Sequence, residues 1–238
     1  MTSGSKLILG LVLVSINLMN CMAQIKPVLT TPNRSNSAST QNYVGTGVSL
    51  TSEDSAYPID GTPYFNEYYL KGMVYSYRGS YADLLMRYNI FLDRVEFRNK
   101  DSVVYTIIPD KVVKKVVIDN NTLVVDTYEL KGDLVSIFFM RQDSGKLILL
   151  TKMMVSFRER EMGKPIVGDV PAKYTRMPDV HYIKSGDGPL VKIQNIKKLI
   201  EGLPDHQKEM EEFAKKEKTS SNKAKELTSF IKYYNSLP

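Results

Sequence analysis

Residues suited to acid–base or metal chemistry are few and dispersed in this sequence. The chain of 238 residues has two histidines, His181 and His206, and a single cysteine, Cys21. The histidines share no local ligand spacing, and the sequence contains no HExxH, CxxC or calcium-loop motif. We therefore expect no metal site, no cofactor and no catalytic residue, and we expect both histidines to be structural or solvated.

Nucleophilic and glycosidic chemistry have equally little support. No serine lies in a GxSxG setting, so a nucleophile elbow is not indicated. Glu96 is the one carboxylate that stands out, because it alternates with Val95 and Phe97 inside an expected strand. A cross-strand partner for Arg87 explains Glu96 better than catalysis does. A glycan hydrolase would need a second carboxylate about 5–10 Å away, and no such pair is indicated.

Basic side chains gather in one segment of the chain. The formal net charge is +6, and residues 141–198 contain 12 basic and 6 acidic side chains, so the whole excess lies there. Five of these residues form a candidate patch for an anionic lipid, lipopolysaccharide or polysaccharide: Arg158, Arg160, Lys164, Lys173 and Arg176. A solvated strand-and-loop surface is the alternative. Nucleic acid is not an expected partner, because no nucleic-acid motif is present.

Residues 1–23 have the features of a cleavable signal peptide. Lys6 precedes an apolar run of ten residues, 7–16, which is too short to cross a bilayer core of about 30 Å. Small residues at Cys21 and Ala23 suit a signal peptidase. We expect an exported protein of the periplasm or outer membrane. Cleavage before Cys21, giving a lipoprotein anchored there, is the alternative, and Asn20 fits that peptidase poorly.

Residues 24–62 are expected to form a disordered tether, because they are poor in large apolar side chains and rich in Ser, Thr, Asn and Pro. Residues 63–190 instead show strand-like alternation every 8–12 residues, with Met86, Tyr88 and Ile90 on one face. The turns are too short for crossover helices. We expect a mainly β domain, an antiparallel meander that forms a curved sheet or partly open barrel.

Residues 191–238 are expected to form a C-terminal α-helical appendage. Helices are predicted near 193–200, at 205–217 with Asp205 as N-cap, and at 222–235. The last helix has a candidate docking stripe consisting of Leu227, Phe230, Ile231 and Tyr234. A helix of about 14 residues is marginal alone. We therefore expect the stripe to dock on the chain's own sheet with Phe230 as the anchor; a partner protein is the alternative.

One long run of sequence resembles an uncharacterised family of secreted β-rich proteins of Bacteroidota. The run begins YYLKGMVYSYRGSYADLLMRYN and continues through IFLDRVEFRNK. The matching elements are Tyr69–Gly72, Arg87–Asn89, Glu96-Phe97 and, near the C-terminus, Tyr233–Asn235. The resemblance covers residues 65–238. It implies a secreted β protein with a short helical C-terminus, and it supplies no catalytic residue.

These features together predict a non-enzymatic cell-envelope binding or scaffold protein. Its expected partner is an envelope protein or a lipid, with contact to a membrane surface included. One alternative is a periplasmic carrier of a lipid or lipoprotein acyl chain, which depends on analogy with half-barrel folds. The other alternative is an envelope-glycan hydrolase. A dry cavity lined by Tyr, Met and Leu would favour the carrier, and a flat exposed aromatic patch would favour the scaffold.

Overall fold

The computed structural model describes residues 57–98, 104–130, 132–163 and 168–238. The expected signal peptide, Cys21, most of the expected tether and Lys164 lie outside these ranges. Within them, no helix is both long and apolar enough to span a membrane.

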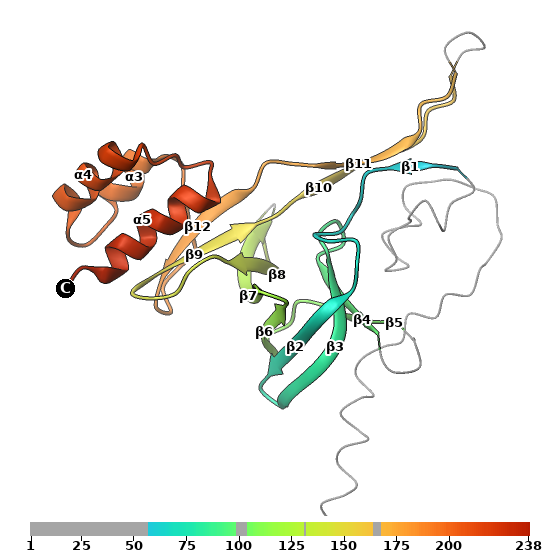
Figure 1. Ribbon diagram of the computed structural model, residues 1–238, viewed down its shortest axis with the longest axis horizontal. Helices are drawn as coiled ribbons and strands as arrows, with labels where there is room; N and C mark the ends of the chain where they lie inside the picture. Colours follow the sequence, from blue (N-terminus) through green and yellow to red (C-terminus); the bar gives the residue numbers. More distant parts are fainter. Residues whose placement is uncertain (1–56, 99–103, 131, 164–167) are drawn as a thin grey trace, which may run out of the picture.

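The architecture is mainly β, as the alternation predicts. A ten-stranded antiparallel sheet curls into a half-barrel, a three-stranded sheet projects from it, and three helices pack at one end (Figure 1). The large sheet contains β2 (Leu70–Ser76), β3 (Gly79–Asn89), β4 (Arg94–Arg98), β5 (Val104–Ile107), β6 (Val113–Ile118), β7 (Asn121–Leu130), β8 (Asp133–Arg141), β9 (Leu147–Lys152), β12 (Val180–Ser185) and β13 (Val191–Lys192). The small sheet contains β1 (Ile59–Asp60), β10 (Val155–Arg158) and β11 (Ala172–Arg176).

The chain does not follow one continuous meander. The order across the large sheet is β13-β12-β9-β8-β7-β6-β2-β3-β4-β5. Strands β2 to β5 form one meander and β6 to β9 another, but the chain returns after β5 so that β6 pairs with β2. In that pairing Val74 and Val116 lie directly opposite each other, and both are buried. Because β6 pairs with β2, both meanders share one continuous buried face.

The inner face of the curl is filled by the chain's own side chains. Met86, Tyr88 and Ile90 are buried there, as the alternation predicts. The rings of Tyr88 on β3 and Phe138 on β8 lie 6.0 Å apart. Four strand spacings separate β3 from β8, which would be about 19 Å in a flat sheet. The contact is therefore possible only because the sheet curls, and it makes this face the core.

The expected tether ends inside the fold. Ile59 and Asp60 form β1, which pairs in parallel with Ala172 and Lys173 of β11. A strand of two residues has no measurable alternation, so sequence periodicity could not reveal it. Residues 59–60 therefore belong to the small sheet and not to a tether.

The C-terminal appendage consists of α3 (Ile196–Glu201), α4 (Gln207–Glu217) and α5 (Ala224–Ser236). The helices bury one cluster with Leu147 and Leu149 of β9. The expected N-cap role of Asp205 is wrong, because α4 begins after His206, which has a left-handed backbone with φ of 53°. The Asp205 carboxylate instead accepts a hydrogen bond of 2.7 Å from the Tyr234 hydroxyl, which joins the start of α4 to α5.

Candidate functional sites

The expected pairing of Arg87 with Glu96 is present. The two residues lie directly opposite each other on β3 and β4, and Arg87 Nε donates a hydrogen bond of 2.8 Å to Glu96. Asn89 Nδ2 also donates to this carboxylate at 3.3 Å. All three side chains lie on the face of the sheet opposite Met86 and Tyr88, because side chains alternate along a strand.

Two tyrosines from the segment before β2 cover this pair. The Arg87 guanidinium lies 3.7 Å from the ring centre of Tyr64 and 4.5 Å from that of Tyr69. Both tyrosine hydroxyls donate to Glu96, at 3.3 and 3.4 Å. Burial, followed by the charge of Glu96, raises the pKa of Tyr64 far above its ordinary value. With four donors around it, the Glu96 carboxylate anchors the segment 64–69 on the sheet.

A second carboxylate, Asp93, is half-buried, and no sequence signal marks it beyond its place in a turn. Its backbone is left-handed, with φ of 50°. It accepts a hydrogen bond of 2.6 Å from the Tyr88 hydroxyl and one of 3.1 Å from the Phe138 N–H. Burial raises the pKa of Asp93, although both hydrogen bonds oppose the shift. Asp93 faces the core and Glu96 faces the opposite side, so these two carboxylates do not share a cleft.

Two arginines of the predicted basic patch form ion pairs with aspartates of the same chain. Arg160 forms an ion pair with Asp169 and lies 3.6 Å from the ring centre of Tyr57. Arg176 pairs with Asp179. The hydrogen bonds that Arg160 donates to Tyr57 and Asp169 raise the pKa of Arg160. Two of the described patch residues are therefore already neutralised within the chain.

Arg158 and Lys173 are the two described patch residues without such an ion pair. They are direct cross-strand neighbours of β10 and β11, and both side chains are exposed. Like charges directly opposite each other destabilise a strand pair. Asp60 lies beside Lys173 on β1, and no ion pair joins the two within the described chain. The pair is thus an exposed dication on the outer face of the small sheet.

The small sheet forms an arm, defined here as residues 155–163 and 168–176. Its inner face is fixed to the turn after β3, because the ring of Phe91 lies 5.4 Å from that of Tyr174 and 6.1 Å from that of Phe157. Beyond this anchor the two strands extend away from the body (Figure 1). An isolated bridge between Glu161 and Val170 continues their pairing. The arm therefore projects while its base is held rigidly.

The candidate docking stripe is buried within the chain. Leu227, Phe230 and Ile231 are 0% exposed and Tyr234 is 4% exposed, against β9 and the other helices. The Asn235 side chain accepts a hydrogen bond from the Leu147 N–H and donates one to the Leu147 carbonyl, both at 2.9 Å. A Cβ at Gly145 would lie 2.5 Å from this amide, so any larger residue there would displace the amide. The stripe thus belongs to the internal interface between α5 and the sheet.

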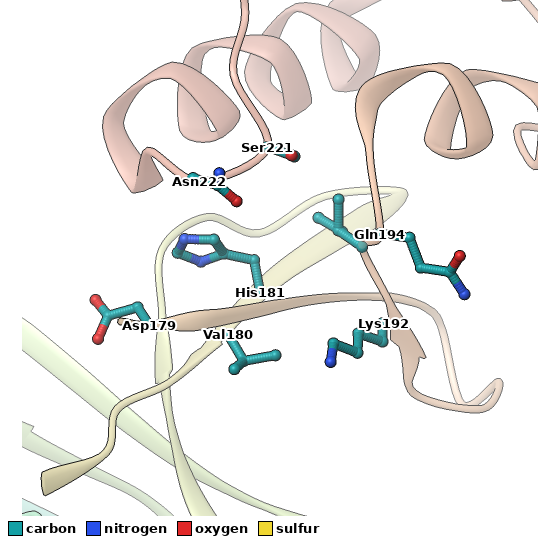
Figure 2. A pocket seen from close by; sticks show the side chains of 8 residues that line it. Asp179, Val180, His181, Lys192, Gln194, Ser221 and Asn222 are labelled. Atoms are coloured by element: carbon teal, nitrogen blue, oxygen red, sulfur yellow. The ribbon is translucent and has the colours of Figure 1, made fainter. Parts of the chain in front are cut away.

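His181 lines a notch at the edge of the sheet (Figure 2). The notch has a volume of about 390 Å³ and lies between β12, the residues after β13, and the segment before α5. His181 is 3% exposed, and its Nδ1 lies 2.9 Å from Thr151 Oγ1. Its Nε2 has no hydrogen-bond partner among the described residues. Burial lowers the pKa of His181, and the charge of Asp179 and then the Asn222 backbone oppose this shift.

His206 lies elsewhere and shares no site with His181. Its Nε2 is 3.2 Å from the Pro238 carbonyl, and its Nδ1 is 3.5 Å from Glu209. Among the described residues, no group of three His, Cys, Asp or Glu side chains is placed to hold a metal ion. His181 therefore connects β12 to β9, and His206 connects the start of α4 to Pro238.

No family model matches the chain, and neither a curated protein nor a solved structure is significantly similar to it. Any functional assignment must therefore come from the surfaces themselves.

Proposed function

We propose that this protein is a non-enzymatic binding or scaffold protein of the cell envelope, and that its arm contacts an anionic sugar there. The main support is the exposed dication formed by Arg158 and Lys173 on a projecting hairpin. The partner class is a phosphorylated or carboxylated sugar, because compact anionic groups can accept hydrogen bonds from both side chains at once.

The position of the arm supports the same proposal. Its base packs on Phe91, but the strands beyond it cover no part of the main core. Met162, near the far end of the arm, is almost fully exposed. A segment that contributes little buried area to its own fold is better explained by contact with another molecule.

The carrier alternative has less support. A bound acyl chain would need space on the inner face of the curl, and buried side chains such as Met86, Phe138 and Met140 occupy that face. A hydrolase would need two facing carboxylates, but the carboxylates of Asp93 and Glu96 point to opposite sides of the sheet.

The proposal is tested by replacing the dication with Arg158→Gln and Lys173→Gln together. We expect the affinity for lipopolysaccharide, measured by isothermal titration calorimetry, to fall by roughly tenfold or more, since hydrogen bonds to charged groups contribute about 1.5–3 kcal/mol each. Lipid-free polysaccharide from the same source shows whether the sugar alone is sufficient. The control, Lys225→Gln with Lys232→Gln, removes the same charge from the exposed face of α5. Equal binding by the arm variant and the wild type would refute the proposal.

A further inference from the structure

We infer that the end of the curled sheet near the β2–β3 turn docks on an anionic lipid bilayer. This surface, the lysine–tyrosine end, consists of Tyr75, Tyr77, Ile108, Lys111, Val112, Lys114 and Lys115. It is separate from the arm, and the inference does not depend on the sugar partner proposed for the arm.

A β-bulge turns two consecutive lysines toward one surface. Tyr75 lies opposite Lys115, but the next residue, Ser76, lies opposite Val113. Lys114 is therefore the extra residue of the bulge. In a regular strand Lys114 and Lys115 would point to opposite faces. Here the Lys115 Nζ lies 4.4 Å from the ring centre of Tyr75, and the Lys114 Nζ lies 4.4 Å from that of Tyr77.

Apolar side chains are exposed beside these lysines. Tyr77 is 74% exposed, Ile108 56% and Val112 37%. The Tyr77 N–H donates a hydrogen bond of 3.1 Å to the Val112 carbonyl, which holds the β2–β3 end against the connection before β6. Exposed apolar groups rimmed by charge are typical of protein or membrane contact sites.

The turn that presents these side chains is held by Asp110. Its carboxylate accepts a hydrogen bond of 3.1 Å from the Val112 N–H, and its carbonyl accepts one of 2.9 Å from the Val113 N–H. The surface is therefore formed before any partner binds, so docking requires little ordering of the backbone.

The charge of the lysine–tyrosine end is not neutralised within the described chain. Lys111, Lys114 and Lys115 take part in none of the ion pairs formed by the described residues. This contrasts with Arg160 and Arg176 of the arm, which have acidic partners. Charge complementarity therefore calls for an anionic surface.

The mixture of side chains favours lipid over polysaccharide. Lysine stems and tyrosine rings are apolar along their length and polar at the tip, which suits the headgroup boundary of a bilayer. A polysaccharide could neutralise the lysines but would leave Ile108 and Val112 in water. In Figure 1 the β2–β3 turn lies far from both the arm and the helices, so bilayer docking would leave the arm free to contact its own partner.

The test uses the purified protein and co-sedimentation with vesicles. We expect binding to vesicles of phosphatidylglycerol and phosphatidylethanolamine and much weaker binding to phosphatidylcholine vesicles. A juxtamembrane lysine contributes a factor of about five, so Lys114→Gln with Lys115→Gln should weaken binding roughly thirtyfold. Lys111→Gln, in the turn, should weaken it about fivefold and leaves both tyrosine contacts in place. The Lys225→Gln and Lys232→Gln variant and the arm variant should bind like the wild type.

Three results would overturn the inference. The wild type could fail to sediment with anionic vesicles, or the lysine variants could sediment as well as the wild type. A third contrary result would be equal affinity for dextran sulfate together with no effect of Val112→Ser on vesicle binding, which would assign the surface to a lipid-free polyanion. Because the arm variant is measured in parallel, failure here is distinguishable from failure of the sugar proposal.

Discussion

The C-terminal helices and the arm both extend from the same curled sheet, but their polar side chains have different neighbours. At the helical junction, Asn235 pairs with both backbone groups of Leu147, and Asp205 pairs with Tyr234. On the outer face of the arm, Arg158 and Lys173 oppose each other with the same charge. The first arrangement stabilises the fold, whereas the second costs some stability and leaves two cations exposed. Under the proposed function, the helical junction would serve stability and the arm would serve binding.

The largest expected effect tests whether the helical junction is part of the core. Phe230→Ala removes a fully buried ring, and such truncations cost about 3–5 kcal/mol. At about 2–4 °C per kcal/mol for a chain of this size, the unfolding midpoint should fall by roughly 10 °C in calorimetry. Tyr68→Ala, at an exposed aromatic position, is the control and should leave the midpoint in place. An unchanged midpoint for Phe230→Ala would show that the helices do not stabilise the sheet.

His181 should make the free energy of unfolding depend on pH, and it lies where β12 meets the segment before α5. Its folded pKa is below the ordinary value of 6.5, since burial disfavours the charged form. The unfolded chain therefore binds more protons between these two values, and stability is lost as the pH falls below about 6.5. His181→Gln should lose less stability than the wild type between pH 7 and 5 in urea titrations. Identical slopes for His181→Gln and the wild type would contradict this assignment.

The smallest expected effect concerns the stability of the arm. Arg158→Gln with Lys173→Gln relieves a like-charge pair, and cross-strand pairs contribute about 0.2–1 kcal/mol. The free energy of unfolding should therefore stay the same or rise slightly, even as sugar binding falls. The measurement is a urea titration at low salt, repeated at high salt, where screening should remove any gain. A loss of stability would mean that the two cations support the fold.

The residues that suggested a family resemblance have structural roles. In the segment Arg87–Asn89, the first and third side chains bind Glu96 and the second binds Asp93. In Tyr233–Asn235, the first ring stacks on Phe213 at 4.4 Å, and the other two residues bind Asp205 and Leu147. These motifs join distant segments of the fold.

Much of the fold could be predicted from short-range patterns in the sequence. A period of two revealed the buried face of β3, and a helical period revealed the stripe of α5, since both depend only on residues near in sequence. The cross-strand pair Arg87 and Glu96 could also be predicted, because a tight turn places its two strands side by side. The two-residue strand β1 could not, because it is too short to have a period.

By itself, the sequence determined the mainly β class, the helical C-terminus, the burial of alternating faces and the segment that contains the basic excess. Only the tertiary structure decided that β6 returns to β2, that Asp93 reaches the backbone of Phe138, and which cations have acidic neighbours. The physical reason is that period and turn propensity are local properties, whereas pairing partners depend on residues far apart in the chain. For the same reason Lys114 and Lys115 could be recognised as one surface with Tyr75 and Tyr77 only after the bulge between β2 and β6 was known.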